Sequence, residues 1–195
     1  MRCKFFYLGT IMMMIVLSSY AQDEHVHSMA MQDVSVMEGF NIVPEFQLID
    51  HIGNTINQSI LDNNYTLIGF GFTNCPDVCP LMAFNMGMAL EQMPVNSQGV
   101  FISVDTERDS PQITHDYASS FHPRMSGLSG SIDQINSASN NFKVSYTVTK
   151  TPSSYVVQHT SSIYLFGPSR ELMNIFSFND SADVILEGFR ELYGN

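Results

Sequence analysis

The sequence predicts a single α/β domain in which helices cover a central mixed sheet, with a short leader in front of it. Two apolar runs, residues 65–72 and 100–104, have the length and composition of strands that are buried on both faces. A helical segment separates the two runs, so they are expected to lie parallel in one sheet. The chain has 195 residues, of which 44% are hydrophobic, and this is enough for one sizeable core.

The residues around the first run predict a hairpin and a helix. Residues 46–50 alternate between apolar and polar side chains and are followed by a turn at residues 51–54, which indicates a small hairpin. A helix is expected over residues 81–93, because Pro80 is tolerated in a first helical turn and Pro94 ends the helix.

Helices follow the second run, and the chain then returns to strands. Residues 111–121 are expected to be helical, with Asp109 or Ser110 as the N-cap, and residues 131–142 follow with Ser131 in the capping position. The C-terminal part is expected to contain strands at 155–158, 162–166 and 171–178, and a closing helix that Asp180 or Ser181 caps and that ends at Tyr193.

The first 21 residues have the features of an export signal. Arg2 and Lys4 precede an apolar stretch, and small residues lead up to Ala21, after which we expect cleavage. An uncleaved membrane anchor is the alternative, although the apolar stretch is shorter than the roughly 20 residues that a bilayer span needs. The expected organisation is a signal peptide or membrane anchor at 1–21, a flexible tether at 22–40 and a globular domain at 41–195. The protein is therefore expected to be periplasmic or exported, with attachment to the inner membrane as the alternative.

Imidazole and thioether side chains alternate along the predicted tether. They belong to His25, His27, Met29 and Met31. Both ligand types suit copper, so a metal-binding role stands beside the simpler interpretation of a solvated tail.

The charge of the chain excludes one large class of function. The formal net charge is −11, whereas nucleic-acid binding needs a basic face that contacts phosphates. The acidity is compatible with a cationic partner surface or a metal ion, although acidity alone commonly serves solubility.

Cys75 and Cys79 are the two cysteines that remain after cleavage of the leader. They stand between the end of a buried strand and the start of a helix, where ligands of open α/β sheets gather and where a helix N-terminus favours the thiolate. Their spacing lets both sulfurs face one ion and also permits a disulfide. A metal site, a redox pair and a structural disulfide all remain open on this evidence.

Four methionines occur on the helix that follows the cysteines. Met is a flexible side chain that fills cores and adaptable surfaces, so these residues favour core packing or a partner surface over copper ligation. They are Met82, Met86, Met88 and Met93.

Five segments, in this order and at these separations, carry a resemblance to a known family. They are GFTNCPDVCPL (71–81), VDTERDSP (104–111), FHP (121–123), GLSG (127–130) and YVVQHTSSIYL (155–165). Over residues 40–193, the chain resembles the Sco/SenC family of copper chaperones.

The resemblance implies a thioredoxin-like fold that holds one copper ion, Cu(I) or Cu(II), through Cys75, Cys79 and His159. It also implies a role in assembling the dinuclear copper centre of cytochrome c oxidase, with the copper-site subunit of that enzyme or another copper acceptor as the partner. Some relatives resemble thiol-disulfide oxidoreductases or redox sensors, so an enzyme that uses the two cysteines as a redox pair is the alternative. The chain departs from the family at Gln158, where an aspartate is common.

The loop after the second apolar run is expected to support the site. Arg108 and Asp109 belong to it, and we expect them to brace the neighbouring cysteine loop rather than to perform chemistry. Asp77, between the cysteines, has two open interpretations: it tunes the site electrostatically, or it solvates the loop.

Overall fold

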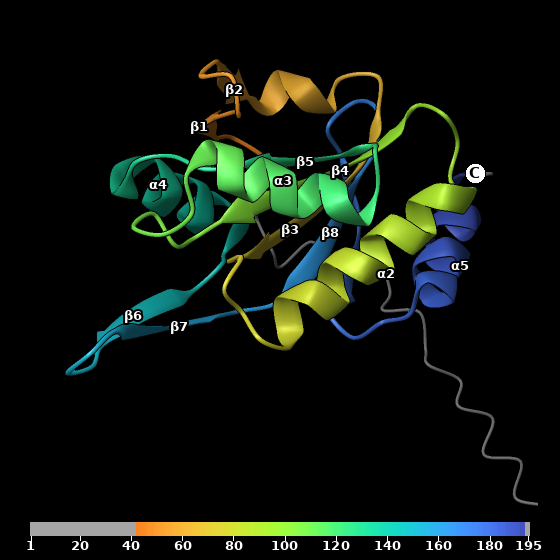
Figure 1. The fold of residues 1–195 in the computed structure, drawn as a ribbon. Helices are drawn as coiled ribbons and strands as arrows, with labels where there is room; N and C mark the ends of the chain where they lie inside the picture. The colour runs from red at the N-terminus through yellow and green to blue at the C-terminus, as the bar shows by residue number, and fades with distance from the viewer. Residues whose placement is uncertain (1–41, 194–195) are drawn as a thin grey trace, which may run out of the picture. The chain divides into compact units, whose positions relative to one another are not determined.

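A five-stranded mixed sheet forms the centre of the structure, a computed structural model that describes residues 42–193 (Figure 1). Its strand order is β5-β4-β3-β8-β9, in which β3, β4 and β5 are parallel and β8 and β9 run antiparallel to their neighbours. The strands are β3 (Tyr65–Gly71), β4 (Ser97–Ser103), β5 (Met125–Leu128), β8 (Ser162–Phe166) and β9 (Leu172–Ser177). The predicted mixed sheet and its parallel strand pair are confirmed, and the predicted leader and tether lie outside the described residues.

Helices cover both faces of the sheet because successive side chains of a strand point to opposite faces. Gly69 of β3 faces α2, where a side-chain carbon would lie 2.8 Å from the methyl group of Met82. The next residue, Phe70, faces α4, and its ring lies 5.2 Å from that of Phe142. Figure 1 shows α2 and α3 in front of the sheet and α5 beside α2. The helices are α2 (Val78–Gln92), α3 (Pro111–Phe121), α4 (Ile132–Phe142) and α5 (Ala182–Tyr193).

Three of the helix starts agree with the predicted caps, and at α5 the Ser181 hydroxyl accepts a hydrogen bond from the Val184 N–H at 3.4 Å. Ser110 accepts a hydrogen bond from the Ile113 N–H at 3.3 Å, and Ser131 forms a reciprocal capping box with Gln134. Helix α2 differs, because it begins three residues earlier than expected and its N-cap residue, Asp77, makes no capping hydrogen bond with its side chain. None of the helices within residues 42–193 is both long enough and apolar enough to cross a bilayer.

The remaining elements are short hairpins, of which the sequence predicted one in full. The expected N-terminal hairpin is present as β1 (Gln47–Ile49) and β2 (Thr55–Asn57), followed by the 3-10 turn η1 (Gln58–Leu61). The second hairpin pairs β6 (Tyr146–Lys150) with β7 (Tyr155–His159) and extends away from the sheet in Figure 1.

Strands β5 and β6 are absent from the sequence prediction. Strand β5 has only four residues, one of them a glycine, so it carries no readable period. The side chains of β6 are mostly exposed, so it lacks the apolar face by which a strand is recognised.

Candidate metal centre

Three chain segments bring the predicted ligands together. Cys75 lies in the loop after β3, Cys79 lies in the first turn of α2, and His159 is the last residue of β7. The Sγ atom of Cys79 is 3.3 Å from Nε2 of His159, although 80 positions separate the two residues. The Sγ atom of Cys75 accepts a hydrogen bond from the backbone N–H of Cys79 at 3.4 Å. Both cysteines are free thiols in the structure.

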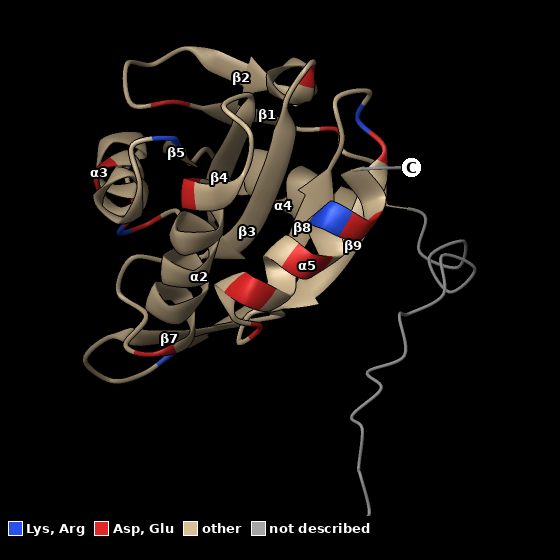
Figure 2. Cartoon of the chain, turned by 90° about the vertical axis from the view of Figure 1, so that its right-hand side faces the viewer, with Lys and Arg blue, Asp and Glu red and all other residues tan. Residues whose placement is uncertain are grey.

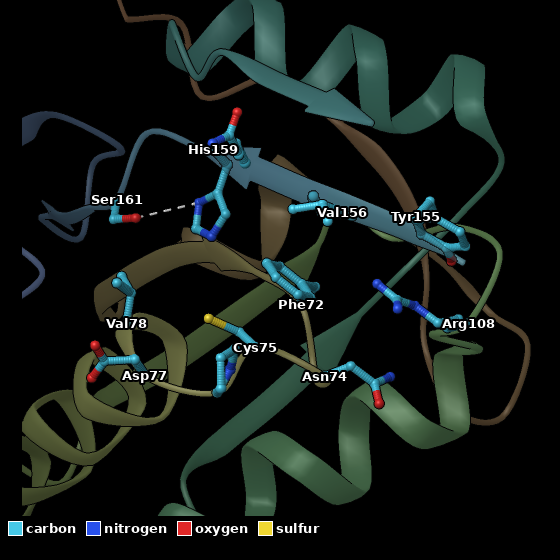
Figure 3. A pocket seen from close by; sticks show the side chains of 13 residues that line it. Phe72, Asn74, Cys75, Asp77, Val78, Arg108, Tyr155, Val156, His159 and Ser161 are labelled. Carbon is cyan, nitrogen blue, oxygen red and sulfur yellow. Dashed lines mark hydrogen bonds between the residues drawn. The ribbon is translucent and has the colours of Figure 1, made fainter. Parts of the chain in front are cut away.

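Each contact among Cys75, Cys79 and His159 joins two of these residues, and none joins all three. Within residues 42–193, no three side chains of His, Cys, Asp or Glu are already arranged to hold one ion. In Figure 3 the sulfur of Cys75 points into the cavity on the side of His159. The three-residue ligand set therefore stays a prediction.

A cavity of about 590 Å³ opens beside the thiols and the imidazole (Figure 3). Its walls are mostly apolar near the sulfur, where Phe72, Val78 and Val156 contribute side chains. Asp77 lies at the same cavity and is exposed, and no hydrogen bond of its side chain decides between its two predicted roles. Cys79 is not part of the cavity wall and is fully buried.

Burial keeps Cys79 protonated. The residue has no exposed surface, and it fits closely beside Gly71, where a side-chain carbon would lie 2.9 Å from its sulfur. Desolvation raises the pKa of the Cys79 thiol far above its usual value. The expectation that the helix N-terminus favours the thiolate is therefore wrong for Cys79, because the cost of burying a charge outweighs the helix dipole.

The imidazole of His159 presents Nε2 to the thiol. Its Nδ1 lies 2.9 Å from the carbonyl oxygen of Thr160, which can only accept, so Nδ1 carries the proton and Nε2 has a free lone pair. Burial lowers the pKa of His159, which keeps the ring neutral. The Ser161 hydroxyl lies 3.5 Å from Nδ1, and the ring packs against the edge of Phe72 at 5.8 Å between centroids.

Asp109 fixes the start of the cysteine loop. Its carboxylate accepts hydrogen bonds from the Thr73 N–H (2.7 Å), the Thr73 hydroxyl (2.7 Å) and the Ser103 hydroxyl (2.6 Å). The side chain is almost completely buried. The expected bracing role of Asp109 is confirmed by these contacts.

Arg108 joins the loop at residues 104–110 to the hairpin that carries His159. Its guanidinium group pairs with Asp105 at 2.5 Å and lies 4.1 Å from the centroid of the Tyr155 ring. The Tyr155 hydroxyl donates to Asp105 at 2.5 Å, and burial together with this carboxylate raises the pKa of Tyr155 to about 12. Phe72 and Tyr155 are site residues that sequence reasoning missed. The sequence feature that could have identified them is their position, because each stands within four residues of a predicted ligand.

We expect iodoacetamide to modify Cys75 before Cys79 in the reduced protein. Cys75 lines the cavity, whereas Cys79 is buried and its raised pKa keeps it as the poorly nucleophilic thiol. At neutral to mildly alkaline pH, the two rates should differ by at least about tenfold, as followed by tandem mass spectrometry. The same reaction in urea is the control and should remove the difference. Equal rates in the folded protein would contradict the burial of Cys79.

Comparison with known proteins finds one family. The family model described as SCO1/SenC matches residues 35–194. Protein SCO1 homolog 1, mitochondrial, from Arabidopsis thaliana is 33% identical over 174 residues, which cover 84% of this chain and 52% of that protein. The SCO2-like protein of Rickettsia prowazekii is 35% identical over 74% of each chain. The mouse protein SCO2 homolog, mitochondrial, is 33% identical, and the match covers 75% of this chain and 60% of the mouse protein.

Solved structures with the same fold include copper-bound proteins. The crystal structure of Arabidopsis thaliana ScoI with copper bound has a TM-score of 0.73 and 34% identity, and the match covers 78% of this chain and 98% of that one. Yeast Sco1 with copper bound has a TM-score of 0.70 and 29% identity, and the match covers 77% of this chain and 87% of the yeast chain. The chain spans about half the length of the Arabidopsis protein and three fifths of the mouse protein.

Proposed function

Because the chain belongs to the SCO1/SenC family, we propose that it binds one copper ion through Cys75, Cys79 and His159 and passes the ion to an acceptor protein. The observation that carries this proposal is the 3.3 Å contact between the buried Cys79 sulfur and the free lone pair of the His159 imidazole. Two thiolates and one imidazole form a soft, three-coordinate ligand set, which suits Cu(I). Zinc usually requires a fourth ligand.

Copper is the cargo of this protein rather than a permanent part of it. The family resemblance makes the copper-site subunit of cytochrome c oxidase the first candidate for the acceptor, and the export signal that the sequence predicts at residues 1–21 is compatible with this partner. Delivery would proceed by ligand exchange, in which thiolates of the acceptor replace those of the chaperone one at a time.

The protonation states of Cys79 and His159 are compatible with such an exchange. Cys79 is held as a thiol, so metal binding must release its proton, and metal affinity should increase with pH. His159 is held neutral with Nε2 toward the sulfur, so it can bind without losing a proton. The side chains of Phe72 and Val78 line the same cavity as the Cys75 thiol and make its wall apolar there.

A thiol-disulfide oxidoreductase is the second candidate function. The different exposure of the two thiols supports it, because Cys75 lines the cavity whereas Cys79 is buried. The Cys75 thiolate would attack a partner disulfide and release one partner thiolate. The Cys79 thiol would then lose its proton to the released partner thiolate, and its sulfur would displace the second partner thiolate, which leaves a Cys75–Cys79 disulfide and a partner reduced by two electrons. Fast exchange that copper does not affect would favour this enzyme.

Metal titration of the reduced full chain tests the copper proposal. We expect one Cu(I) per chain in competition with a chromophoric chelator, with sulfur and nitrogen neighbours in the X-ray absorption spectrum. Chains with both cysteines replaced by serine provide the control and should take up no ion at this site. The absence of uptake, or an ion without sulfur neighbours, would overturn the proposal.

A further inference from the structure

Helix α2 exposes an apolar side to solvent. Within residues 79–90 the exposed positions are Leu81, Phe84 and Met88, which have 40%, 53% and 45% of their surface exposed. At the helical pitch these residues lie within about 60° of one another, so they form one stripe, which we call the α2 stripe. Most other residues of the helix are also apolar, the exceptions being Asn85, Glu91 and Gln92, and helices that are apolar all round are normally covered on every side. The α2 stripe is thus an uncovered face within residues 42–193.

The α2 stripe begins beside the candidate metal centre. The helix starts at Val78, which lines the cavity, and Cys79 lies in the same turn. Leu81 is the i+3 neighbour of Val78, so the stripe continues the apolar wall of the cavity along the helix. A protein that takes an ion from Cys79 and His159 must approach the cavity beside these residues, and the α2 stripe is the surface next to that cavity.

The surroundings of the α2 stripe are acidic. Exposed carboxylates stand before the helix, at its C-terminal end and on the neighbouring helix α5: Asp77, Glu91, Asp183 and Glu187. Figure 2 shows the α2 ribbon almost wholly tan and red bands on α5. Two cations stand near the C-terminal end of α2, and both donate hydrogen bonds there: Arg190 to Gln92 at 3.4 Å, and Arg124 to the carbonyl oxygens of Leu90 and Pro94. An apolar strip with negative flanks is complementary to an apolar patch with a positive rim.

We propose that the α2 stripe is the docking surface for the acceptor protein, and that this acceptor presents an apolar patch rimmed by lysine and arginine. The inference rests on the proposed function, because it assigns the surface through which the ion is delivered. A second copy of the chain is disfavoured, since it would bring acidic flanks against acidic flanks. An anionic membrane surface is disfavoured for the same reason, because it attracts basic segments.

Binding and transfer measurements with a defined acceptor test the proposal. The probe is the purified soluble copper-site domain of cytochrome c oxidase subunit II from the same organism, titrated with the reduced full chain without copper. The stripe variant replaces Leu81, Phe84 and Met88 with glutamine, and the matched control is Ile132→Gln, which changes a side chain of 49% exposure on α4. We expect the stripe variant to weaken binding and slow Cu(I) transfer by at least about tenfold, with its Cu(I) affinity unchanged. The control should behave as wild type, and added salt should weaken wild-type binding.

Each alternative result has a defined meaning. Equal binding by wild type and stripe variant, or no binding of the wild type to the domain, overturns the proposal. If the wild type forms a dimer and the same substitutions dissociate it, the stripe binds a second copy of the chain. If the wild type binds lipid vesicles and the substitutions abolish this binding, the stripe contacts a lipid surface. Either result overturns the proposal. The single variant Phe84→Gln replaces the triple variant if the latter does not fold. Because the complex is measured without copper, a failure of copper binding would contradict only the proposed function.

Discussion

Replacement of His159 with alanine is expected to weaken Cu(I) binding by more than roughly 100-fold, because loss of a direct ligand costs more than loss of its hydrogen-bonding support. The remaining cysteines would hold the ion with two sulfurs and no nitrogen. The fold should persist, because His159 ends a two-stranded hairpin and is not part of the five-stranded sheet. Competition with a chromophoric Cu(I) chelator measures the change, and thermal unfolding of the copper-free protein confirms the fold.

The matched control for this measurement is His51→Ala. His51 is an exposed histidine in the turn after β1, and it stacks on His115 at 3.8 Å between ring centroids rather than lining the cavity. Its replacement should leave Cu(I) affinity unchanged. If His159→Ala and His51→Ala bind copper equally well, His159 is not a ligand, and the proposed centre is reduced to its two thiols.

Asp109→Ala should lower the free energy of unfolding by about 4 kcal/mol, because one buried donor and two partly buried donors would lose a charged acceptor at once. These donors are the N–H and hydroxyl of Thr73 and the hydroxyl of Ser103. The same substitution releases the start of the cysteine loop, so Cu(I) affinity should fall together with stability. Urea denaturation at neutral pH gives the free energy, and an unchanged m-value shows that the unfolded state is comparable.

Asp116→Ala is the control for the stability measurement. Asp116 is exposed on α3, and its side chain accepts a hydrogen bond from Gln112 at 2.8 Å, an exposed pair that contributes little. Its loss should change the free energy of unfolding by less than about 0.5 kcal/mol. A similar effect for both variants would show that the Asp109 network does not stabilise the loop.

The sequence was sufficient for the parts of the fold that depend on burial and local chemistry. The runs that became β3 and β4 are buried on both faces, and continuous apolar composition is the direct signature of that environment. The Ser110 and Ser131 caps are local interactions over three residues, so they are also readable from the chain alone. Strand β6 was not readable, because its hydrogen bonds to β7 stabilise it without an apolar face.

The candidate site divides in a similar way. Family motifs located Cys75, Cys79 and His159, and the structure places the last two in contact. The protonation of Cys79 could not be predicted from its place at a helix N-terminus, because it depends on Gly71, Phe101 and the sheet that enclose the sulfur. Likewise, the bond from Tyr155 to Asp105 joins residues 50 positions apart and requires the folded hairpin.

The candidate ligands belong to two parts of the structure that can move relative to each other, because His159 lies on the β6–β7 hairpin and the cysteines do not. The cysteines stand in the loop after the central strand β3 and in the first turn of helix α2, whereas the imidazole ends a ribbon whose strands pair only with each other. Isolated two-stranded ribbons are marginally stable, and side-chain contacts such as that of Tyr155 with Asp105, rather than a ladder of the main sheet, hold this one to the domain. An ion held by all three groups would therefore lose its nitrogen neighbour first and present an open coordination position while both sulfurs still retain it.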